Sequence, residues 1–503
     1  MKSFLGEKDR KIVPRWRGFR ASVGNTQNET PKLGDRVSPS LQSNVDDWRR
    51  EGTLWTALDA VAGAIVEGRL DLVTDALSRV QVDPQTPPAA LAILVEHERN
   101  NSVHEDADLP VVARCREQIR ASRIRLGEYP YDAIEWIDLA RSFTTLGSLE
   151  KARRSVAAAL TLAPADVFVL RAASRFYIQQ GDPDHAQWIL TKAPRTLRNP
   201  WLLASEIAAA SVAGRESQLL KVAERMERAD FRDEDLTELR AALATVELDA
   251  GSQTKGKRLL RRSLNGANEN ALAQIQWMDH TRLGNIIDIS GTKPPNRHEA
   301  AAWKAFFEGN WDTSVDKSLS WFQDQPFSVN AGIFSSYVLA DILGRPDDAL
   351  AILDISLRAN AEDVTLLNNL AYSYIQIGKI DIAARVLESI QRKPDNLEYA
   401  TLEATVGLLA FRQGLPDEGR NLYENAIKTF QRGGAQDFAA RAAVYLAIEE
   451  VRARTPNSAL AVKRAFDLTK DNKRADVAAK IQELERIAKA WLSEEGAAVE
   501  SGL

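Results

Sequence analysis

Glycine residues recur at a fixed interval in this chain, and that interval limits the folds it can adopt. Gly147 and Gly181 lie 34 positions apart, and so do Gly344 and Gly378. A small residue follows each of these glycines at the same distance: Ala152, Ala186, Ala349 and Ala383. A period of 34 residues is typical of helix-turn-helix units, which bury their apolar faces only by stacking on one another. The sequence therefore predicts an all-α solenoid of helical hairpins.

The residues around the glycines also follow a common order. In the segment 133–166 they are Trp136, Leu139, Ala140, Phe143, Gly147, Ala152, Val156, Ala159 and Pro164. Bulky rings fill the space between hairpins, alanines allow two helices to cross closely, and proline ends a helix. This order resembles the tetratricopeptide repeat signature, in at least five units over roughly 300 residues. The resemblance implies a superhelix with a concave binding groove.

Breaks in the helical pattern divide the chain into five parts. We expect a basic, disordered arm (1–46), an N-terminal helical-repeat solenoid (47–284), a proline-containing interruption (285–297), a C-terminal repeat solenoid (298–472), and a capping helix with a tail (473–503). The interruption has no helical period and contains Pro294 and Pro295. It is the place where two sub-solenoids would meet.

The arm combines positive charge with a short apolar tract. Its first 20 residues carry a net charge of about +5. The tract 12–19 holds Trp16 and Phe19. One interpretation is a solvated, disordered tail. The other is an anchor that docks onto the solenoid or onto a partner, because an isolated tryptophan in a polar arm lowers solubility unless a pocket covers it.

Composition and motifs favour a binding protein over an enzyme. The five histidines form no HExxH motif, the single Cys115 rules out a disulfide within the chain and any multi-cysteine metal site, and no phosphate-binding glycine loop follows a strand pattern. We therefore expect no catalysis, no metal and no cofactor. No apolar window is long enough to span a membrane, and the net charge of −5 is small. These features predict a cytoplasmic protein.

The resemblance assigns specific residues to the concave groove, because the first helix of each hairpin lines it in the tetratricopeptide family. The first half of the groove would show Arg141, Arg171 and Arg175, and the second half Trp303, Phe306, Phe334, Asn368, Tyr372 and Phe411. The pair Arg171 and Arg175 suits a carboxylate or phosphate, or is simply solvated. The aromatic set lines the groove or packs between adjacent first helices.

Two functions follow from these residues. The first is a non-catalytic adaptor whose groove binds a peptide or a partner protein through several weak pockets. The alternative is a nucleic-acid-associated regulatory subunit, for example the partner of a nuclease, that uses the arm and the helix 255–262. That helix carries a basic patch made of Lys255, Arg258, Arg261 and Arg262, and its other interpretation is a solvated convex face.

Overall fold

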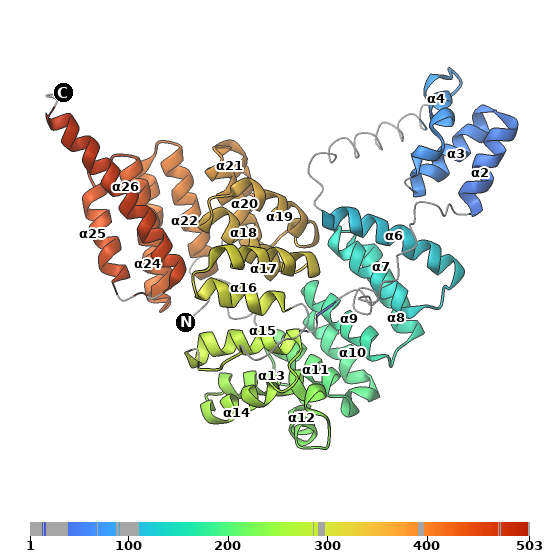
Figure 1. Cartoon of the computed structure of the whole chain (residues 1–503), viewed down its shortest axis with the longest axis horizontal. Coiled ribbons are helices and arrows are strands. Elements are labelled where there is room, and N and C mark those ends of the chain that lie inside the picture. Colours follow the sequence, from blue (N-terminus) through green and yellow to red (C-terminus); the bar gives the residue numbers. More distant parts are fainter. Residues whose placement is uncertain are drawn as a thin grey trace. The chain divides into compact units, whose positions relative to one another are not determined.

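The computed structural model describes residues 13, 15, 16, 39–67, 69–86, 90, 110–284, 286–289, 297–390, 397–470, 472 and 474–500 of the 503-residue chain. These residues form helices and contain no strand (Figure 1). The first helices are α2 (Pro39–Glu51), α3 (Leu54–Glu67), η3 (Leu70–Leu72), α4 (Thr74–Val82), α6 (Pro110–Glu128), α7 (Ala133–Thr145), α8 (Leu149–Leu162), α9 (Val167–Gln179), α10 (Pro183–Lys192), η4 (Pro194–Arg198), α11 (Pro200–Val212), α12 (Leu220–Glu227) and α13 (Asp233–Asp249). They continue as α14 (Gln253–Ser263), α15 (Glu269–Met278), η5 (Asp279–Leu283), α16 (His298–Phe307), α17 (Trp311–Asp324), α18 (Val329–Tyr337), η6 (Val338–Ile342), α19 (Pro346–Ala359), α20 (Val364–Gln376), α21 (Ile380–Glu388), α22 (Leu397–Arg412), α23 (Pro416–Arg432), α24 (Gln436–Arg452), α25 (Ser458–Thr469) and α26 (Ala475–Glu500).

The recurring glycines lie at the turns between paired helices. Gly181 separates α9 from α10 with a φ of 72°, and Gly378 separates α20 from α21 with a φ of 76°. This left-handed conformation favours glycine because it has no Cβ atom. Gly147 has a second constraint, since a Cβ atom there would collide with the carbonyl oxygen of Arg358. The predicted all-α solenoid of helical hairpins is confirmed.

Aspartate side chains begin the first helix of two of these hairpins. The carboxylate of Asp166 accepts a hydrogen bond from the Val169 backbone N–H at 3.0 Å, and that of Asp363 accepts one from the Leu366 N–H at 2.9 Å. Each bond satisfies a backbone donor that has no partner within the first helical turn. The same local chemistry therefore starts α9 and α20.

The chain divides into two compact units. The smaller unit comprises Gly18–Phe143 and Lys151–Ala158, and the larger one, unit 1, comprises Met1–Arg17, Thr144–Glu150 and Ala159–Leu503. In the smaller unit α2, α3 and α4 share a core that includes Leu41 and Val45. Helix α2 thus begins at Pro39, within the segment 1–46 interpreted as an arm, because its apolar residues pack on α3.

The interruption at 285–297 lies inside unit 1. Helices α15 and α16, on its two sides, pack directly against each other. The Asp279 carboxylate accepts hydrogen bonds from the N–H groups of Ile286 and Ile287 at 3.0 and 2.9 Å, and Ile287 and Ile289 are buried. The segment therefore joins two neighbouring helices of one compact unit. Its role as a boundary between two sub-solenoids stays a prediction.

Helix α26 packs mainly against α24, and its role as a capping helix stays a prediction. Its Leu484 is fully buried in a cluster with Val444 and Ile448 of α24. No helix in the described part of the chain is both long and apolar enough to cross a membrane.

Candidate partner-binding site

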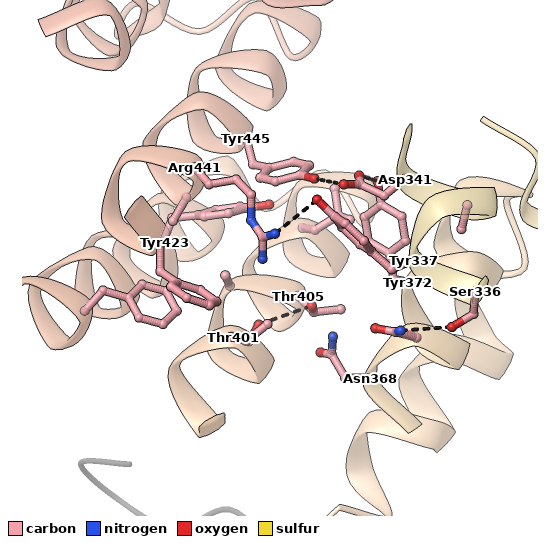
Figure 2. Close-up of a pocket in the computed structure, with 17 residues that line it drawn as sticks. Ser336, Tyr337, Asp341, Asn368, Tyr372, Thr401, Thr405, Tyr423, Arg441 and Tyr445 are labelled. Atoms are coloured by element: carbon pink, nitrogen blue, oxygen red, sulfur yellow. Dashed lines mark hydrogen bonds between the residues drawn. The ribbon is translucent and has the colours of Figure 1, made fainter. Parts of the chain in front are cut away.

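A pocket opens among the last hairpins of unit 1, between α18, η6, α20, α22, α23 and α24 (Figure 2). It spans about 650 Å³, including space that is continuous with solvent. Its lining residues are Ser336, Tyr337, Ala340, Asp341, Asn368, Asn369, Tyr372, Thr401, Ala404, Thr405, Leu408, Tyr423, Phe430, Phe438, Arg441, Ala442 and Tyr445. Polar groups and aromatic rings therefore share one cavity, and we call it the polar pocket.

Asp341 is the point where several helices meet. One carboxylate oxygen accepts a hydrogen bond from the Tyr372 hydroxyl at 2.7 Å, and the other accepts one from the Tyr445 hydroxyl. The Lys480 ammonium of α26 forms an ion pair with the same carboxylate at 3.2 Å. Asp341 lies in the π-helix η6. This helical form is rare in proteins, and where it occurs it is often at a functional site. One buried carboxylate thus ties η6 to α20, α24 and α26.

Arg441 faces Asp341 from α24, across the pocket (Figure 2). Its guanidinium donates a hydrogen bond to the Tyr337 hydroxyl at 3.1 Å and lies 3.7 Å from the Asp476 carboxylate. It also covers the Tyr337 and Phe438 rings, at 5.4 and 5.3 Å from their centroids. Burial lowers the pKa of Arg441, but Tyr337, Tyr445 and Asp476 outweigh burial, and the pKa is raised overall. The pocket therefore holds a fixed positive charge.

The tyrosines of the pocket remain neutral. Burial raises the pKa of Tyr337, Tyr372, Tyr423 and Tyr445 well above the usual value, and the Asp341 carboxylate raises the pKa of each further. Three of the four hydroxyls donate hydrogen bonds to carboxylates. Those of Tyr372 and Tyr445 donate to Asp341, and that of Tyr337 donates to Asp476 at 3.2 Å. The pocket is consequently held in one arrangement by groups that keep their protons at neutral pH.

Two adjacent asparagines of α20 differ in how their side chains are paired. The Asn369 amide donates to the Ser336 hydroxyl at 3.0 Å and to the Ile333 carbonyl at 3.4 Å. Asn368 is only 7% exposed, and its Oδ1 atom has no hydrogen-bond partner among the described residues. A buried acceptor without a partner costs about 1–3 kcal/mol. The polar pocket is therefore lined by a residue whose buried acceptor lacks a hydrogen bond among the described residues.

The other residues assigned to the second half of the groove lie outside the pocket lining. Trp303, Phe306 and Phe334 are at most 5% exposed, with ring centroids 4.4 Å apart for Trp303 and Phe334 and 5.5 Å apart for Phe306 and Phe334. Phe411 is also buried and packs on Tyr423 at 6.3 Å. The contacts of Trp303 and Phe306 with Phe334 are the packing between adjacent first helices that the sequence offered as the alternative. Phe411 and Tyr423 instead belong to the two helices of one hairpin, α22 and α23.

Two of the arginines assigned to the first half, Arg171 and Arg175, have different partners within unit 1. The Arg171 guanidinium bonds to both Glu238 carboxylate oxygens at 2.9 Å and to the Trp201 carbonyl at 3.2 Å. Arg175 lies over the Phe327 ring, and burial, together with the Arg15 charge, lowers the pKa of Arg175 to about 10. Arg141 belongs to the smaller unit. Among the described residues of unit 1, Arg171 and Arg175 therefore form no common anion site.

The basic patch on α14 is partly neutralised by neighbouring acids. The Lys255 ammonium contacts Glu224 and Glu247 at 2.9 and 2.6 Å. Arg262 pairs with Glu227 at 2.5 Å, whereas Arg258 and Arg261 are exposed. Of the two arm residues assigned as anchors, Trp16 is fully buried and Phe19 lies outside the described residues.

Sequence reasoning missed Asp341, Tyr337, Arg441 and Tyr445, although two of them leave a local signal. Arg441 interrupts the alanine-rich stretch 439–443, and Asp341 interrupts the apolar stretch 337–343. A charged residue inside an otherwise apolar helical stretch is rarely buried unless it has a partner. Such positions could have identified the pocket.

Comparison with known proteins assigns no family. No family model matches the chain, and no curated protein matches it. Among solved structures, it is similar to Cut9 in the APC/C hetero-tetramer Cut9-Hcn1, with 10% identity over 88% of this chain and 92% of that chain and a TM-score of 0.38. Human IFIT1, in a dimer with PPP-AAAA, shows 12% identity over 90% and 94%, with a TM-score of 0.33. The P58(IPK) TPR domain shows 13% identity over 73% and 93%, with a TM-score of 0.22.

Proposed function

We propose that this chain is a non-catalytic scaffold that binds an extended segment of a partner protein in the polar pocket. The observation that carries the proposal is the Asn368 side chain, which lines a cavity that opens to solvent and whose buried Oδ1 atom has no hydrogen-bond partner among the described residues. An asparagine amide can pair with the backbone of an extended peptide. Protein binding would therefore recover the free energy that this acceptor loses in the unbound chain.

The rest of the polar pocket fits an uncharged part of such a segment. Asp341 is already paired with Lys480, and Arg441 lies near Asp476, so neither charge demands an opposite charge on the ligand. Tyr372 and the other rings offer apolar surface for a side chain beside the amide. Aromatic anchors in pockets of this kind carry much of the affinity of protein interfaces.

The alternative of nucleic-acid binding has less support. Electrostatic attraction to phosphates requires uncompensated cations. On α14, Lys255 and Arg262 are paired with glutamates, which leaves Lys257, Arg258 and Arg261, and the chain as a whole has a net charge of −5. We therefore propose protein binding alone.

The proposal is tested by comparing partners recovered from native lysate with matched variants. Asn368→Ala combined with Tyr372→Ala removes the acceptor and one ring from the pocket. The control, Asn425→Ala, removes the same amide from an exposed position on α23. We expect mass spectrometry to identify partners that the wild type and the control share and that the double variant loses, while circular dichroism shows that it stays folded. Equal recovery by the folded double variant contradicts the proposal.

A further inference from the structure

A second inner site of unit 1 is filled by the chain's own arm. Trp16 is fully buried, and its ring lies edge-on to Phe176 of α9 with centroids 6.1 Å apart. The Trp16 ring centroid also lies 5.4 Å from that of Phe327, a residue of the loop between α17 and α18. The Trp16 backbone carbonyl accepts a hydrogen bond from the Gln325 side chain at 3.3 Å. The arm thus contacts two helical regions that are far apart in the sequence.

Arg15 brings a positive charge to two carboxylates beside this aromatic cage. It forms ion pairs with Glu299 of α16 and, at 3.4 Å, with Glu269 of α15. These two carboxylates are close neighbours, because the Glu299 backbone N–H donates to Glu269 at 3.1 Å. Their side chains are 12% and 4% exposed, so their charges are screened only weakly by water. The site therefore selects a cation followed by an aromatic ring.

A second arginine competes for the same carboxylates. The Arg175 guanidinium lies over the Phe327 ring, which Trp16 also contacts, at 5.4 Å from the ring centroid. Arg175 has no hydrogen bond or ion pair with the described residues. The Glu299 charge attracts Arg175, while the Arg15 charge repels it. When Arg15 leaves, Arg175 can turn to Glu299 and reduce the cost of leaving the two buried acids without a cation. Because Arg175 can take the place of Arg15, the arm can leave and return. An arm that was a fixed structural element would not need such a replacement cation.

We propose that the site formed by Phe176, Phe327, Glu269 and Glu299, here called the arm site, recognises an arginine followed by an aromatic residue. The arm fills it within the same chain, and a free peptide with this pair of residues exchanges with the arm. The ligand class is a short cationic and aromatic peptide, and its recognition combines buried ion pairs with a ring in an aromatic pocket.

The test uses the full chain and a labelled peptide with the sequence of residues 12–19. In the vacated variant Arg15→Ala with Trp16→Ala, the arm no longer competes. A tethered segment has an effective concentration on the order of 1 mM, so a peptide with a Kd of about 10 μM for the vacant site would bind the wild type about 100-fold more weakly. Fluorescence anisotropy measures both affinities. A peptide with alanine in place of its arginine and tryptophan should bind neither protein, and adding Glu299→Gln to the vacated variant should weaken binding at least about 10-fold.

Equal peptide affinity for the wild type and the vacated variant, or no binding by a vacated variant that circular dichroism shows to be folded, overturns the proposal. If the vacated variant does not fold, the wild type with a protease site inserted after Asn28 replaces it. After cleavage of the folded protein, exchange of the arm fragment for excess peptide supports the proposal. An arm fragment that stays bound until the protein unfolds contradicts it.

Discussion

The arm site and the polar pocket are built from similar residues but are covered differently. At the arm site, Arg15 and Trp16 supply the cation and the ring that the surrounding acids and aromatics need. In the polar pocket, the acid Asp341 has its cation in Lys480, yet the Asn368 acceptor has no partner among the described residues. The chain itself therefore completes the arm site, whereas we propose that a partner completes the polar pocket.

This difference has a physical origin in how each site satisfies its buried charges. The polar pocket pairs them within its own stack of hairpins, so it stays assembled without a ligand. The arm site gathers two carboxylates whose cation comes from outside the repeats. A buried charge that loses its partner destabilises the fold strongly. We therefore expect substitutions of the charged residues of the pocket to act on stability, and substitutions of the arm residues to act on exchange.

The largest effect should come from Asp341→Ala. This change removes the acceptor of two tyrosine hydroxyls and one partner of the buried Lys480, and we expect a loss of about 3–5 kcal/mol in the free energy of unfolding. The control is Asp354→Ala, which breaks an exposed pair with Arg358 and should cost no more than about 1 kcal/mol. Urea denaturation measures both. Equal losses would show that the Asp341 network does not hold the pocket together.

A pair of tryptophan variants compares the arm with the core of the stack. Trp321 of α17 is 2% exposed and cannot leave its position, so Trp321→Ala should cost about 3–5 kcal/mol. Trp16→Ala should cost less, about 1–3 kcal/mol, because the loss cannot exceed the free energy with which the arm docks. Denaturation curves of the two variants give the comparison. Losses of the same size would make the arm an integral part of the core.

Alkaline pH should act on the two sites in opposite directions. The tyrosines of the polar pocket have raised pKa values, so above pH 10 the unfolded chain releases their protons first and stability falls, by up to about 1.4 kcal/mol per pH unit for each tyrosine. Arg175 has a lowered pKa of about 10, so its contribution rises over the same range. Urea unfolding between pH 9 and 11 should show a shallower decline for Tyr372→Phe and a steeper one for Arg175→Met. Unchanged slopes in both variants contradict these assignments.

The sequence predicted the repeating unit well because its determinants are local. A glycine at a turn and an aspartate at a helix start act within a few residues, as Gly378 and Asp363 show. The sites depend instead on contacts between distant residues. Tyr445 and Asp341 are 104 positions apart, and a repeat period carries no information about such a pair.

The aromatic residues illustrate the same limit. Trp303 and Phe334 occupy first-helix positions that the resemblance assigns to the groove, yet each contacts the other in the packed interior. Helical periodicity tells which residues share a face but not whether a neighbouring hairpin covers that face. For Trp16, the sequence left a solvated tail and a docked anchor open. Its contacts with Phe176 and Phe327 come from residues 160 or more positions away.

The most direct test of the polar pocket as a binding site is the unfolding free energy of Asn368→Leu. Leucine has nearly the same shape as asparagine but no acceptor to leave unpaired. If the amide oxygen is kept for a partner, the variant should be more stable than the wild type by about 1 kcal/mol in urea denaturation. A loss of about 1 kcal/mol or more would show that the amide is already satisfied in the unbound chain and would contradict the account.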